Sequence, residues 1–165
     1  MGAQPREAQA APWPAPDPAA QRAQEYADHD RKVQRNLARI NACAFGKDAP
    51  LIAARYEATW KAIKDSPDSA FEYKNFPFPV FFPLDIPPLP AHITYERVKA
   101  FVLSPVRSNG EISNRKQIKD ETRRWHPDHF SKTLRKVRED HRDLVKEAAD
   151  VVIRCLTDLK ADPTI

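Results

Sequence analysis

The first half of the chain carries apolar residues at helical spacing in two stretches. Between residues 19 and 44, one face is apolar and the other faces are charged, and Gly46 follows as a stop signal. A second helix is predicted over residues 51–64, where apolar side chains recur every three or four positions. The two apolar faces are Tyr26, Val33, Leu37 and Ile40, and Ile52, Tyr56, Trp60 and Ile63. Ser66-Pro67 should end the second helix, because proline disfavours the helical conformation of the residue before it.

Residues 76–91 replace the helical pattern with phenylalanine and proline. Six prolines fall between residues 77 and 90, and proline fixes φ and lacks an amide donor. The segment is therefore predicted to be an extended connector. Its four phenylalanines are too apolar to remain in water, which favours a strap packed across the helices. The alternative, a polyproline-like ligand for another protein, would leave these aromatic side chains exposed.

Helical patterns return in residues 92–162. Thr94 can cap a helix that ends at Ser104-Pro105, and a loop containing Asn109-Gly110 follows. The apolar face of this helix is Tyr95, Val98, Phe101 and Val102. Ser113 or Asn114 then opens the next helix, and Asn114 with Gln117 has the spacing of a capping box. This helix carries Ile118, Thr122 and Trp125 inward.

The helix that opens at residue 113 or 114 must end at His126, because Pro127 follows. The last helix is predicted to begin near residues 138–140. Its apolar stripe is Val145, Ala148, Val151, Val152, Cys155, Leu156 and Leu159. With only 3 glycines against 16 prolines, helices joined by proline-punctuated connections are favoured over a many-stranded sheet. We therefore expect a mainly α protein.

Composition bounds the organisation and the class of the protein. A chain of 165 residues has room for one domain with flanking elements. Residues 1–18 contain five prolines and little apolar surface beyond Trp13, so a disordered tail is predicted. No stretch approaches the roughly 18 apolar residues of a membrane helix, and no secretory signal is present. A cytoplasmic or nuclear protein without membrane contact is expected, and its oligomeric state stays open.

The segment Arg124-Trp125-His126-Pro127-Asp128 carries the most chemistry. Pro127 fixes the turn, so that His126 and Asp128 project in defined directions. Asp128 can accept hydrogen bonds from the amides of residues 130 and 131. A helix C-terminus at His126 favours the charged form of its imidazole. The preceding helix is basic on its outer face through Lys116, Lys119, Arg123 and Arg124.

These residues resemble the end of helix II and the His-Pro-Asp turn of the J-domain of DnaJ-type co-chaperones. In that family an aromatic residue commonly precedes the tripeptide, and an apolar helix III packs antiparallel on helix II. The resemblance covers about 70 of the 165 residues, from 92 to 162. It implies an activator that is not itself an enzyme and that accelerates ATP hydrolysis by a DnaK-type chaperone. The implied contact residues are His126, Pro127, Asp128, Lys116, Lys119, Arg123 and Arg124.

The chain departs from the J-domain pattern in two places. His129 stands where J-domains usually have a basic residue, and residues 130–137 have the apolar content of an additional helical turn. The segment is also similar to the J-like C-terminal region of NF-kappa-B-inhibitor-like proteins. Together with the Phe/Pro-rich strap, the arrangement looks like lineage-restricted fungal proteins of unassigned function.

Two alternatives stay open beside the co-chaperone hypothesis, together with the role of the N-terminal helices. The tripeptide could simply join two helices in an interaction module without chaperone activity. Residues 115–146 hold 11 Lys or Arg and 6 Asp or Glu, which permits weak contact with nucleic acid, although interleaved acids are typical of a solvated face. The helices of residues 19–75 could brace the J-like unit or cover its basic face. No catalytic signature, cofactor site or metal site is expected, because helical surroundings do not converge His126 and Asp128 on a metal.

Overall fold

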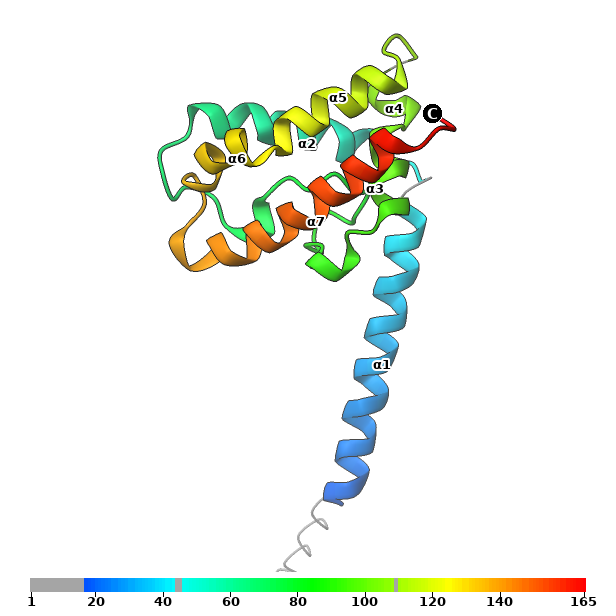
Figure 1. Ribbon diagram of the computed structural model, residues 1–165. Coiled ribbons are helices and arrows are strands. Elements are labelled where there is room, and N and C mark those ends of the chain that lie inside the picture. The colour runs from blue at the N-terminus through cyan, green and yellow to red at the C-terminus, as the bar shows by residue number, and fades with distance from the viewer. Residues whose placement is uncertain (1–16, 44–45, 109) are drawn as a thin grey trace, which may run out of the picture. The chain divides into compact units, whose positions relative to one another are not determined.

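The structure is a computed structural model and describes residues 17–43, 46–108 and 110–165. It is mainly helical, as predicted (Figure 1). Of the predicted disordered tail, residues 1–16 lie outside the described residues, and Pro18 already begins the first helix, α1 (Pro18–Cys43). In the described part of the chain, no helix is both long enough and apolar enough to cross a membrane.

Within the described residues, residues 17–37 and the part from residue 38 onward belong to two separate compact units. The second unit contains the end of α1, where Ile40 and Cys43 are buried, together with everything that follows. This unit extends across residues 75 and 91 without further division. The second predicted helix, the strap and the C-terminal helices share one core.

Helix α2 (Ala49–Asp65) has the predicted apolar face. Pro50 lies in its first turn, where a missing amide donor costs nothing, and Ser66 adopts an extended conformation before Pro67. The buried residues of α2 are Ala49, Ile52, Ala53, Tyr56, Trp60 and Ile63. The spacing of these side chains places them on one side of the helix, which packs into the core.

The Phe/Pro-rich segment is a buried strap. It runs between two short 3-10 turns, η1 (Tyr73–Asn75) and η2 (Pro90–His92). Its apolar side chains Phe76, Phe78, Val80, Phe81 and Phe82 are all buried. The rings of Phe78 and Trp125 are stacked with centroids 6.1 Å apart, and the centroid of Phe81 lies 4.8 Å from that of Phe101. The predicted packing of this segment across the helices is therefore confirmed.

Two helices follow the strap. The hydroxyl of Thr94 caps α3 (Tyr95–Val102) by accepting the amide of Arg97 at 3.3 Å, as predicted. The predicted loop after Ser104 instead begins with a short helix, α4 (Pro105–Ser108). Proline at the first helical position removes an amide that would have no helical partner, so Pro105 both ends α3 and begins α4.

Helix α5 (Asn114–Trp125) is capped by Ser113, whose hydroxyl accepts the amide of Lys116 at 3.4 Å. The predicted capping box of Asn114 and Gln117 is wrong. Asn114 is already the first residue inside the helix and is therefore not its N-cap. The side-chain amide of Gln117 donates to the carbonyl of Ile112 at 3.2 Å instead. After α5 come α6 (Pro127–Leu134), η3 (Glu139–His141) and α7 (Arg142–Ala161).

Helices α5 and α7 lie side by side and run in opposite directions (Figure 1). The buried residues of α7 are Val145, Ala148, Ala149, Val152, Cys155, Leu156 and Leu159. A parallel β-bridge between Phe71 and Val137 ties the segment before the strap to the segment before α7. In this bridge the amide of Phe71 donates to the carbonyl of Lys136 at 2.9 Å.

Candidate partner-binding surface

The tripeptide His126-Pro127-Asp128 forms the corner between α5 and α6. His126 has extended backbone angles (φ −61°, ψ 135°), so α5 ends there as predicted. Pro127 is the first residue of α6, which makes the tripeptide a direct helix-to-helix junction. The side chain of His126 is 51% exposed and that of Asp128 is 86% exposed. Both groups are therefore open to a partner.

The predicted capping role of Asp128 is wrong, because His126 caps α6 instead. The Nδ1 atom of His126 accepts the amide of Asp128 at 3.3 Å, and its carbonyl accepts the amide of Phe130 at 2.8 Å. Because Pro127 is the first residue of α6, Asp128 lies in the first turn of this helix. There its negative charge interacts favourably with the helix dipole.

Two aromatic side chains hold this corner on the core. Trp125, just before the tripeptide, is 1% exposed, and Phe130, just after it, is 5% exposed. Their rings are stacked with centroids 5.2 Å apart and an interplanar angle of 19°. The indole Nε1 of Trp125 also donates to the hydroxyl of Tyr56 at 3.2 Å. The exposed residues of the corner thus lie on a rigid base.

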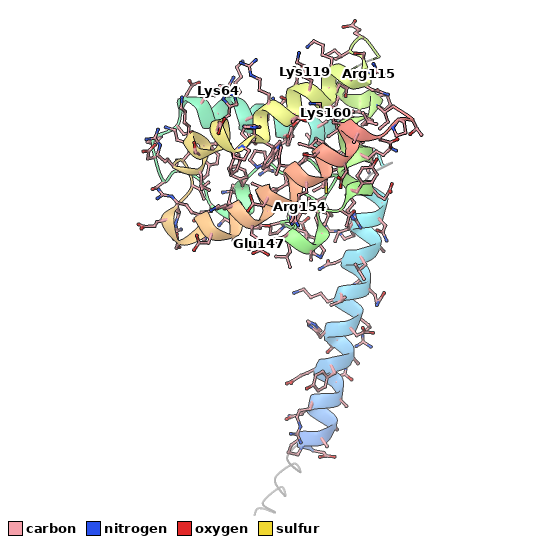
Figure 2. The ribbon with its side chains drawn as sticks, in the orientation of Figure 1. Lys64, Arg115, Lys119, Glu147, Arg154 and Lys160 are labelled. Carbon is pink, nitrogen blue, oxygen red and sulfur yellow. The ribbon has the colours of Figure 1, made fainter. Side chains whose placement is uncertain are left out.

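The four basic residues predicted from α5 do not share one environment. Lys119 and Arg123 are exposed, and Figure 2 shows Lys119 on α5. Lys116 pairs with Asp120 at 3.0 Å, one helical turn away. Arg124 is only 28% exposed because its guanidinium pairs with carboxylates of α2 and α5. Arg124 is thus held inside the fold, which reduces the basic surface that α5 offers.

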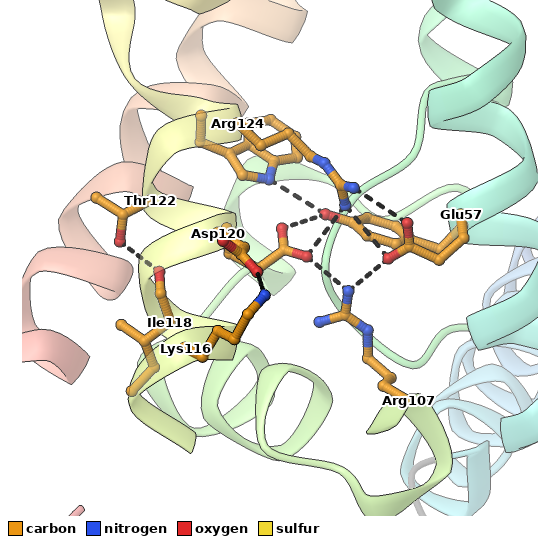
Figure 3. A network of polar contacts seen from close by, with 10 residues as sticks. Glu57, Arg107, Lys116, Ile118, Asp120, Thr122 and Arg124 are labelled. Carbon is orange, nitrogen blue, oxygen red and sulfur yellow. Dashed lines mark hydrogen bonds and ion pairs between the residues drawn. The ribbon is translucent and has the colours of Figure 1, made fainter. Parts of the chain in front are cut away.

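A closed polar network joins α2, α4 and α5 (Figure 3). At its centre the side chain of Glu121 is only 3% exposed. One oxygen of Glu121 accepts the hydroxyl of Tyr56 at 2.7 Å. The other accepts Arg107 at 2.6 Å and Arg124 at 3.1 Å. Glu57 of α2 accepts the same two guanidiniums at 2.6 and 3.0 Å, so two positive and two negative groups offset one another.

The network shifts the titration of its members. Burial raises the pKa of the Tyr56 phenol, and the charge of Glu121 raises it further. Burial alone would raise the pKa of Glu57, but hydrogen bonds and charge from Arg124 and Arg107 outweigh it, so this pKa lies below its usual value. Tyr56 therefore stays protonated and Glu57 stays ionised at neutral pH.

Sequence reasoning missed Glu121 and Arg107 as members of the network. Glu121 follows Ile118 by three positions and precedes Trp125 by four, so helical spacing places it on the inward face. That spacing was the available signal. Arg107 gave none, because α4 is too short to carry a periodic pattern.

No family model, curated protein or solved structure matches this chain. Within residues 17–43, 46–108 and 110–165, no group of three His, Cys, Asp or Glu side chains is arranged to hold a metal ion.

Proposed function

We propose that this chain is a divergent J-domain-like co-chaperone. It contacts a DnaK-type ATPase through His126, Pro127 and Asp128, and the exposed cations of α5, among them Lys119 and Arg123, add positive charge along the helix that leads to this corner. The observation that carries the proposal is the exposed tripeptide at the end of the antiparallel α5–α7 pair, backed by the stacked rings of the neighbouring residues. A corner fixed before binding loses little conformational entropy when a partner docks, which favours such a contact.

The polar network adds to this proposal. Glu57 and Glu121 hold Arg124, and Asp120 neutralises Lys116, so the cations of α5 left to attract an acidic partner surface are Arg115, Lys119 and Arg123. Exposed charges of this kind are screened by salt. Salt should therefore slow the association with the chaperone. The effect should be modest, because few cations of α5 remain unpaired.

The test is single-turnover ATP hydrolysis by a DnaK-type chaperone in the presence of the full chain. His126→Gln should abolish stimulation because it removes the exposed imidazole. His129→Gln is the matched control, since His129 is also exposed and its ring centroid lies 6.4 Å from that of His126. Retained stimulation with His126→Gln, or none with the wild-type chain across bacterial and eukaryotic chaperones, contradicts the proposal.

A second candidate is a helical protein-interaction module without chaperone activity. The capping hydrogen bond from the amide of Asp128 to His126 favours it, because this bond gives the imidazole a structural role. His126→Asn separates the two candidates, since asparagine is a strong N-cap but lacks an imidazole. If His126→Asn keeps the stability of the protein but loses chaperone stimulation, the co-chaperone is supported. If the variant keeps both its stability and its binding to whichever protein the wild-type chain binds, the interaction module is supported.

A further inference from the structure

A groove with basic walls lies between α2, α5 and α6, beside the corner. Its volume is about 750 Å³, in the size range of small-ligand sites. Lys61 and Lys64 of α2 form one wall, and Arg123 of α5 and Lys132 of α6 lie opposite. His129, one residue after the tripeptide, also lines it.

The positive charge of the groove is not compensated by its own acids. Within the described residues, the ion pairs include none that involves Lys61, Lys64, Arg123 or Lys132. The two acids that line the groove are already paired. Glu57 binds Arg107 and Arg124, and Asp120 binds Lys116. Four cations therefore face the groove without a partner charge.

Trp60, which also lines the groove, supplies an independent observation. Its side chain is buried, at 6% exposure, and its indole Nε1 meets no acceptor among the residues that the structure describes. An indole N–H can only donate, and a buried donor without an acceptor is unfavourable. A ligand that reaches this N–H from the groove with an acceptor atom would satisfy it. The groove thus combines unpaired positive charge with a lining residue whose buried N–H has no acceptor.

We propose that this groove binds a ligand that carries phosphate groups close together. The α2 residues that line it, 57–64, span roughly 10 Å at 1.5 Å per residue. A terminal phosphate carries about −1.5 to −2 charges, so two of them within this length balance four cations. Lysine, which supplies three of the four, suits phosphate as a compact point charge.

Two other polyanions fit the groove less well. An extended acidic peptide places about three residues in 10 Å, and successive side chains point to opposite sides. Single-stranded nucleic acid relies on bases stacking on aromatic side chains, whereas the aromatic residue of this groove, Trp60, is buried. Closely spaced phosphates match the number of cations best. They come from a free oligophosphate or from a multiply phosphorylated peptide.

Calorimetric titration of the full chain with tripolyphosphate tests the proposal. Lys64→Gln combined with Lys132→Gln should weaken binding at least tenfold. Arg154→Gln combined with Lys160→Gln removes the same charge from α7 and should change binding less than twofold. Figure 2 shows Lys64 on α2 and the two control residues on α7. Equal losses in both double variants, or no binding by the wild-type chain, overturn the proposal.

Two further arms define the donor and the source of the phosphate. Trp60→Phe keeps an aromatic ring but removes the N–H, and it should weaken binding about 2- to 10-fold, as expected for one hydrogen bond. A doubly phosphorylated peptide that binds more tightly than tripolyphosphate identifies a protein-borne phosphate, and the reverse order identifies the free anion. Equally tight binding of polyglutamate or a single-stranded oligonucleotide of the same charge overturns the proposal. None of these arms requires a chaperone.

Discussion

Replacing Glu121 by glutamine is expected to destabilise the protein through the buried network. Glu121→Gln keeps the shape of the side chain but removes its charge. Arg107, whose side chain is 10% exposed, and Arg124 then share the single remaining carboxylate of Glu57. The hydroxyl of Tyr56 also loses its charged acceptor. One positive charge is left without a partner in a largely desolvated place.

The size of this effect follows from the burial of the group. Removing one partner of a buried ion pair typically costs about 3–5 kcal/mol. The lower end applies here, because Glu57 still faces both guanidiniums and its side chain is 49% exposed. We expect a loss of about 3 kcal/mol in the free energy of unfolding, which lowers Tm by roughly 10 °C for a chain of this size.

Urea unfolding followed by circular dichroism measures this loss. Asp120→Asn is the matched control, because Asp120 is the neighbouring residue on α5 but is 61% exposed and, among the described residues, pairs only with Lys116 (Figure 3). An exposed pair of this kind contributes about 0.5 kcal/mol. A loss for Glu121→Gln no larger than that for Asp120→Asn, at unchanged urea dependence, would refute the reasoning.

Two other parts of the fold give predictions of the same kind. Phe78→Ala should cost about 3–5 kcal/mol in urea unfolding, because a buried ring of the strap is lost, whereas Leu89→Ala, at a side chain 51% exposed, should cost less than about 1 kcal/mol. Equal costs would show that the strap is not part of the core. Hydrogen bonds, led by those from Thr164, hold the pKa of Asp162 well below its usual range. The stabilising effect of ionised Asp162 is therefore present above about pH 4 and is lost as pH falls toward the lowered pKa. Asp162→Asn should reduce the difference in the free energy of unfolding between pH 7 and pH 3. An unchanged difference contradicts this assignment.

The helix ends and the strap could be predicted from the sequence because proline acts locally. Pro67 and Pro127 each come directly after the C-cap residue of a helix, and α2 and α5 end at these positions in the structure. The burial of the strap followed from apolar content that water cannot accommodate. These features depend on the nearest residues in the chain, which a single sequence displays.

Features that depend on distant residues could not be predicted in the same way. The core that α2 shares with α5, to which α2 contributes Tyr56 and Trp60, is one such feature, because no periodic pattern records which helix faces another. Arg124 looks like an exposed base in the sequence, since its acceptor Glu57 lies 67 positions away. At the corner, Asp128 was the predicted acceptor for the amides of the next turn, whereas the start of α6 at Pro127 makes His126 the cap.

Amide hydrogen exchange tests most directly whether a chaperone docks on the His126-Pro127-Asp128 corner. The full chain is compared with and without an ATP-bound DnaK-type chaperone. We predict slower exchange in residues 123–131 and unchanged exchange in residues 154–161 of α7. Unchanged exchange at the corner while the chaperone binds another face, or no slowing anywhere in the chain, would contradict the account.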